Sequence, residues 1–173
     1  LEFQTKAVLA AKRIVTEAML AEKNQRWSAI DAGKWLAGSE KDPQKAAALL
    51  EQALAEQESA ARAARAMDRL FSALKADVEA NRMQNDFFER RMNQIGDLIR
   101  KAVDKRIPAL EKTLEDARPK SAAEEQPEAR MAKMRKALSS IAGEQKLAAV
   151  GFREILDQLM DWNDIQGVLV QTR

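Results

Sequence analysis

The feature that most limits the fold of this chain is an apolar stripe through its middle, from residue 42 to residue 118. Apolar residues recur there at steps of three and four, which places them on one face of an α-helix. The stripe consists of Leu50, Leu54, Ala61, Ala64, Met67, Phe71, Leu74, Val78, Phe88, Met92, Ile95, Ile99 and Ala102. Charged residues occupy the opposite face, which we expect to contact water.

The stripe is interrupted where its register falls on Asn81 and Asn85. An amide at a core position is unfavourable unless it finds a hydrogen-bond partner. Asp86 followed by Glu89 has the spacing of a capped helix start, which indicates a turn just before Asp86. No Gly or Pro lies near these asparagines, however, so one straight helix over residues 43–117 fits the pattern equally well.

The composition favours helices alone. The 173 residues include 32 alanines, only 6 glycines and 4 prolines, and no Tyr, His or Cys. Ala, Leu, Glu, Gln, Lys and Arg are strong helix formers, whereas the β-branched and aromatic residues that favour strands are sparse. We therefore predict an all-α fold.

Four helical segments are predicted, over residues 1–37, 43–80, 86–117 and 127–173. The clearest boundary is the first, because Gly38 suits the left-handed position after a helix, and Asp42 with Pro43 forms a capped helix start. Pro108 interrupts the third segment. Because it lacks a backbone donor and crowds the carbonyl of Asp104, we expect a kink or a restart there.

The last segment has the most regular pattern. Its core positions follow a heptad repeat, typical of a helix that packs lengthwise against others. They are Met131, Met134, Leu138, Ile141, Gln145, Ala148, Phe152, Ile155, Leu159, Trp162, Gln166 and Leu169. Glu22, Asn24 and Gln25 interrupt the apolar face of the first segment, so we expect small alanine contacts there with a polar layer in the middle.

Segments of similar length favour an antiparallel bundle of long helices. With a turn near Asn85 the chain forms an up-down four-helix bundle. Without the turn, a long central helix is flanked by two antiparallel helices. In both cases we expect residues 1–173 to form a single all-helical domain with its two ends near residues 78–88. Neither end carries a capping signal, so we expect the domain to be excised from a longer protein.

The missing residue types exclude several kinds of chemistry. Without Cys or His the chain cannot form a zinc finger, an iron–sulfur cluster, a thiol nucleophile or a Ser-His-Asp triad. Glu154, Asp157, Asp161 and Asp164 are close in sequence, but they lack the Gly and the ligand spacing of a calcium loop. We predict no catalytic, cofactor-binding or metal-binding residues, no cofactor, and a protein that is not an enzyme.

Charge and hydropathy limit the partners. With 29 basic and 27 acidic residues the net charge is +2, so we expect no binding to nucleic acid. No apolar run of about 18 residues occurs, so we expect no membrane span within this chain. A protein partner or self-association is expected instead. The sequence does not indicate a cellular compartment.

Two groups of residues are candidate ligand contacts. Arg62, Arg65 and Arg69 form a basic stripe, and guanidinium groups at this spacing can hold a carboxylate or a phosphate. Neighbouring carboxylates can also pair with these arginines as ordinary surface ion pairs, which is the commoner situation. The second group is polar residues that interrupt the core pattern, namely Gln25, Asn81 and Asn85.

Two functions are compatible with this architecture. The first is a non-enzymatic structural or protein-interaction module of a larger protein, which joins other parts of it and self-associates. The second is an extracytoplasmic ligand-sensing four-helix domain of a membrane receptor, placed between two membrane helices. This second layout resembles bacterial receptor bundles in arrangement only. Apolar segments of about 20 residues before Leu1 and after Arg173 would favour it.

Overall fold

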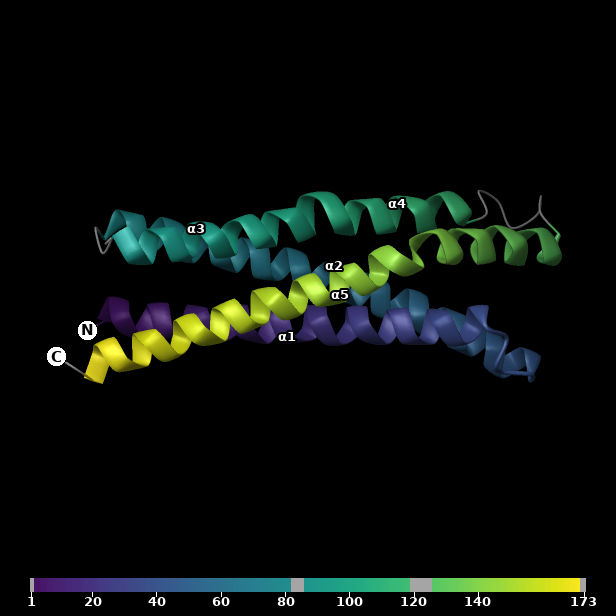
Figure 1. Ribbon diagram of the computed structural model, residues 1–173, viewed down its shortest axis with the longest axis horizontal. Helices are drawn as coiled ribbons and strands as arrows, with labels where there is room; N and C mark the ends of the chain where they lie inside the picture. The colour runs from purple at the N-terminus through teal and green to yellow at the C-terminus, as the bar shows by residue number, and fades with distance from the viewer. Residues whose placement is uncertain (1, 82–85, 119–125, 172–173) are drawn as a thin grey trace.

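The computed structural model describes residues 2–81, 86–118 and 126–171, and it shows an all-α bundle of four helices (Figure 1). The first two helices are α1 (Glu2–Leu36) and α2 (Pro43–Ala80). The third consists of α3 (Asp86–Arg100), the π-helical segment η1 (Lys101–Arg106) and α4 (Ile107–Ala117), and the fourth is α5 (Pro127–Gln171). The described residues include no strand, which confirms the predicted fold class.

The connection between α1 and α2 forms as its residues predict. Gly38 has a φ of +64°, in the left-handed region that glycine adopts without strain. The Asp42 carboxylate accepts hydrogen bonds from the backbone N–H groups of Gln44 and Lys45, and Pro43 is the first residue of α2. The two helices therefore run antiparallel.

The alternative of one straight helix through residues 43–117 is wrong. α2 ends at Ala80, and the side-chain amide of Asn81 donates a hydrogen bond of 2.7 Å to the carbonyl of Asp77 in the last turn. α3 begins at Asp86 and packs back against α2. Asn81, which interrupts the apolar stripe, therefore caps the C-terminal end of α2 and does not occupy a core position.

The third helix accommodates Pro108 by widening. In the π-helical segment η1 the N–H of Ile107 bonds to the carbonyl of Ala102, five residues earlier. Pro108 has no N–H for the carbonyl of Asp104, and its ring crowds that carbonyl. The wider turn gives the proline ring room, so α3, η1 and α4 follow one another as a continuous helix (Figure 1). The predicted kink or restart takes the form of this π-helical turn.

The helices form a closed ring of neighbours. α1 packs against α2 and α5, and the third helix also packs against α2 and α5. Figure 1 shows α2 and α5 running obliquely across the bundle, with both chain ends and the end of α2 at the same end of the molecule. No helix within the described ranges is both long and apolar enough to cross a membrane.

The core contains the predicted seams. On α5 the seam is buried from Met134 to Trp162, whereas Met131 is 45% exposed. The side chains of Gln166 and Leu169, the last two predicted members, lie outside the described part of the structure. Arg135 links α5 to the end of α1, because its guanidinium donates a hydrogen bond of 3.0 Å to the carbonyl of Leu36 and lies 4.8 Å from the ring centroid of Trp35. A cation at the C-terminal end of α1 also suits the helix dipole.

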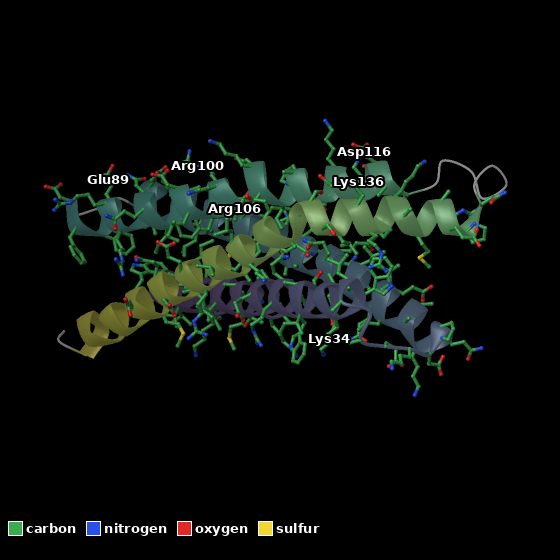
Figure 2. The ribbon with its side chains drawn as sticks, turned by 45° about the vertical axis from the view of Figure 1, so that its right-hand side comes forward. Lys34, Glu89, Arg100, Arg106, Asp116 and Lys136 are labelled. Carbon is green, nitrogen blue, oxygen red and sulfur yellow. The ribbon has the colours of Figure 1, made fainter. Side chains whose placement is uncertain are left out.

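Most charged side chains lie outside this core. Figure 2 shows Lys34, Glu89 and Arg100 directed away from the bundle.

Candidate ligand-binding cleft

A buried layer of amides and one hydroxyl joins three helices near the middle of the bundle. Gln25 on α1 and Gln57 on α2 exchange two hydrogen bonds of 2.9 Å each. Gln145 on α5 donates to Gln57 Oε1 at 3.1 Å and to Ser28 Oγ at 3.2 Å. Ser28 Oγ donates in turn to the carbonyl of Ala53 at 2.7 Å. Each of these four polar residues is at most 2% exposed.

This layer is the polar layer expected on the first helix, and it explains the position of Gln25. Both ends of the Gln25 amide are engaged by Gln57, as a buried amide requires. Neighbouring alanines such as Ala21 and Ala60 are fully buried, so the backbones of α1 and α2 approach closely around the amides.

A cleft of about 870 Å³ opens beside this layer, between α2 and α4. It has an apolar part, formed by Leu54 and Leu114, and a polar part with one amide, one guanidinium and several carboxylates. The polar residues are Gln57, Glu58, Glu111, Glu115, Asp116 and Arg118. Among the described lining residues, carboxylates outnumber guanidinium groups.

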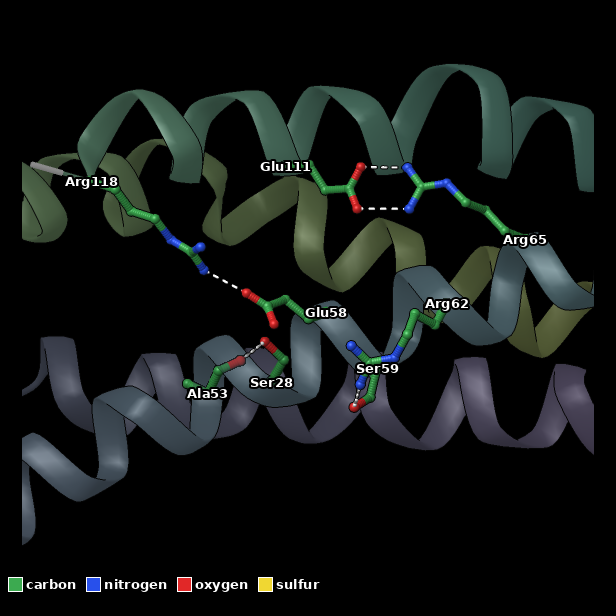
Figure 3. A network of polar contacts seen from close by, with 8 residues as sticks. All are labelled: Ser28, Ala53, Glu58, Ser59, Arg62, Arg65, Glu111 and Arg118. Atoms are coloured by element: carbon green, nitrogen blue, oxygen red, sulfur yellow. Dashed lines mark hydrogen bonds and ion pairs between the residues drawn. The ribbon is translucent and has the colours of Figure 1, made fainter. Parts of the chain in front are cut away.

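Two ion pairs span the gap between α2 and the third helix near the cleft (Figure 3). Arg65 donates two hydrogen bonds to the carboxylate of Glu111, at 2.9 and 2.5 Å, and this bonding raises the pKa of Arg65. Arg118 donates to Glu58 at 2.5 Å. Both pairs are partly solvated, so each contributes only about 0–1 kcal/mol to stability. Their main effect is to position charged groups beside the cleft.

The predicted arginines share a different and shallower groove. Arg62, Arg65 and Arg69 line a groove of about 460 Å³ between α1 and α2, together with Asn24 and Glu17. Arg62 donates a hydrogen bond to Ser59 Oγ at 3.0 Å, and Arg65 turns toward α4 to reach Glu111. Arg69 has no hydrogen bond or ion pair with another described residue. The three guanidinium groups therefore do not converge on one point.

The other candidates lie apart from this groove. Gln25 belongs to the buried layer, and Asn81 caps the end of α2. Asn85 lies outside the described residues. The three arginines thus line one groove without converging, and neither Gln25 nor Asn81 is among the residues that line it.

Sequence reasoning missed the residues of the cleft. Gln57 could have been found, because it fills the one gap in the stripe between Leu54 and Ala61 at helical spacing. Glu111 and Arg118 carried no such signal, since charged residues at exposed helical positions are common.

No protein-family model, curated protein or solved structure matches this chain. Among the described residues, no group of three or more carboxylates is arranged to hold a metal ion. The function is therefore inferred from the geometry of the bundle and its cleft.

Proposed function

We propose that this protein is a non-enzymatic ligand-sensing helical bundle, which binds a small polar molecule in the cleft between α2 and α4. The observation that carries the proposal is the double role of Gln57. It lines the cleft, and its amide is also hydrogen-bonded to Gln25 of α1 and to Gln145 of α5. A ligand that displaces Gln57 thereby acts on the first and the last helix together.

The dimensions and lining of the cleft support this proposal. Small-molecule sites usually measure about 300–1,000 Å³ and combine an apolar wall with a few placed polar groups. The cleft falls within this range and has both kinds of lining. The α1 and α5 helices pack against each other, and the start of α1 lies at the same end of the molecule as the end of α5 (Figure 1), so a relative shift between them can reach that end. This arrangement suits the extracytoplasmic sensing domain of a membrane receptor.

A thermal-shift screen with classes of small charged molecules tests the proposal. A ligand at about 100 times its Kd adds about 2.7 kcal/mol to the free energy of unfolding, which corresponds to a rise in Tm of about 5–10 °C. We expect at least one class to give a saturable rise in the wild type and a much smaller one in Glu111→Gln. The matched control is Glu51→Gln, an exposed position of α2. If no class raises Tm, or Glu111→Gln responds like the wild type, the proposal is wrong.

A structural or protein-interaction module is a second candidate function, favoured by the outer face of α1. Five large apolar side chains of this helix are 39–54% exposed: Leu9, Met19, Leu20, Trp27 and Ile30. Exposed apolar residues grouped on one helix often mark a contact surface. Sedimentation equilibrium tests self-association through this face, with Trp27→Glu as the variant that should weaken it at least about tenfold. A wild type that remains monomeric at all concentrations excludes it.

A further inference from the structure

The carboxylates of the cleft can accept more hydrogen bonds than the protein supplies. Each carboxylate offers about four acceptor positions. Glu111 receives two bonds from Arg65, and Glu58 receives one from Arg118. Glu115 makes no ion pair or side-chain hydrogen bond with another residue of the described ranges. A ligand ammonium group, with three donors and a positive charge, matches Glu111 and Glu115, which lie one turn apart on α4.

The cleft is also lined by hydrogen-bond donors. A ligand with only a positive charge would not bond to them. The amide of Gln57 gives one N–H to Gln25, and within the described part of the chain its second N–H has no acceptor. Gln57 is only 2% exposed, and leaving a buried donor without a partner is unfavourable. Arg118, which also lines the cleft, has five N–H donors and uses one of them on Glu58. These two groups match an anionic acceptor such as a carboxylate.

An apolar contact surface completes the cleft. Leu54 lies one turn before Gln57 on α2, and Leu114 lies one turn before Arg118 on α4. Both leucines therefore lie on the same helix faces as the polar groups. An alkyl chain attached to the charged end of a ligand would be covered by them.

From these three observations we propose that the cleft binds a small zwitterionic amino acid with an alkyl side chain. Its ammonium group contacts Glu111 and Glu115, its carboxylate contacts Gln57 and Arg118, and its side chain packs on the two leucines. The inference rests on the proposed function and narrows the ligand class of the same cleft. It differs from a phosphate or dicarboxylate ligand, which the arginine groove between α1 and α2 would favour.

Isothermal titration of the whole chain with matched probes tests the ligand class. The zwitterions are free alanine, valine and leucine. 3-Methylbutylamine keeps the alkyl chain and the ammonium group of leucine without its carboxylate, and 4-methylpentanoate keeps the chain and the carboxylate without the ammonium. We expect at least one zwitterion to bind, and both truncated probes to bind about tenfold or more weakly than leucine. Absence of binding by all three amino acids overturns the inference, as does an amine or a carboxylate that binds as tightly as leucine.

Variants locate the binding site. Glu115 is exposed, so Glu115→Gln should fold normally and weaken binding of the zwitterion about tenfold or more. Glu51→Gln should leave binding unchanged. If Arg69→Gln weakens binding and Glu115→Gln does not, the ligand occupies the arginine groove and the assignment to the cleft is wrong.

The same experiments separate this inference from the proposed function. If the amino acids fail but another class of molecule raises Tm in a Glu111-dependent way, only the ligand class is wrong. If no class binds, both proposals fail.

Discussion

The α1–α2 pair and the third helix fill the core with different kinds of residues. The α1–α2 pair buries many alanines, such as Ala18 and Ala64, beside larger residues such as Ile14, and a layer of buried amides crosses the interface. The third helix buries large side chains instead, among them Ile95, Ile99 and Ile107, which are fully buried. No buried amide from the described part of the third helix takes part in the layer.

The difference shows how packing distance and register are linked. Alanines allow two helices to approach closely, but each buries little apolar area. Because successive alanines have the same shape, alanine packing alone does not distinguish one register of the two helices from another. A hydrogen-bonded amide pair is directional, so it favours one register. Large branched side chains interlock by shape, and each fully buried one contributes about 1.5–3 kcal/mol. The third helix therefore needs no polar layer to define its position.

The largest expected effect is the loss of one large side chain from the third helix. Ile99→Ala removes a fully buried side chain and leaves a cavity, so we expect the free energy of unfolding to fall by about 2–5 kcal/mol. Urea denaturation measures this change. The control is Ile30→Ala on α1, where the side chain is 39% exposed and the loss should be much smaller. Equal losses at the two positions would show that Ile99 is not packed as a core residue.

The opposite change tests the close approach of α1 and α2. Ala64 is fully buried, so Ala64→Leu should overpack the interface and lower the free energy of unfolding by about 1–3 kcal/mol. Ala55→Leu, at an exposed position of the same helix, should change stability by less than about 0.5 kcal/mol. An Ala64→Leu variant with the same free energy of unfolding as the wild type would show that the interface between α1 and α2 can accommodate a larger side chain.

The amide layer predicts a pattern of single and combined variants. Gln57→Leu leaves the amides of Gln25 and Gln145 buried without this partner, at an expected loss of about 1–3 kcal/mol in urea denaturation. Replacing all three glutamines by leucine should restore much of the lost stability. If the layer fixes the register, the triple variant should also show broadened amide NMR signals. Sharp signals from the triple variant would indicate that shape alone aligns the helices.

The helix boundaries could be predicted because they depend on local chemistry. Gly38, Asp42 and Pro43 act within a few residues of themselves, and α2 begins at the predicted Pro43. The buried faces could be predicted for a similar reason, since steps of three and four define a face whatever lies against it. The choice between a turn and a straight helix depended on Asn81, which can cap a helix or occupy a polar core position.

The cleft could not be predicted, because periodicity identifies the buried face of each helix but not where two helices separate. Glu58 and Arg118 lie on different helices and meet only through the tertiary arrangement. The three arginines were recognised as a stripe, but their partners were not. Arg65 reaches Glu111, which lies on another helix.

The smallest expected effect concerns an acidic pair between α1 and α2. Glu56 lies near Asp31, which is only 3% exposed, and one carboxylate oxygen of Glu56 is buried without a hydrogen-bond partner. Burial raises the pKa of Glu56 above its ordinary value of 4.5, and the negative charge of Asp31 raises it further. A hydrogen bond from Gln52 and the charge of Lys34 act in the opposite direction.

The sign of the pH dependence follows from this shift. Above pH 4.5 and up to the raised pKa, the folded protein holds a proton on Glu56 that the unfolded chain has released, so this group's contribution to stability is lost as pH rises. Glu56→Gln cannot lose that proton. We therefore expect the variant to be more stable than the wild type at pH 7, with the difference shrinking toward pH 4.5. Urea denaturation at a series of pH values, with Glu51→Gln as control, measures it. A difference that grows as pH falls would show that Gln52 and Lys34 outweigh burial and Asp31, so that the folded protein favours the charged form of Glu56.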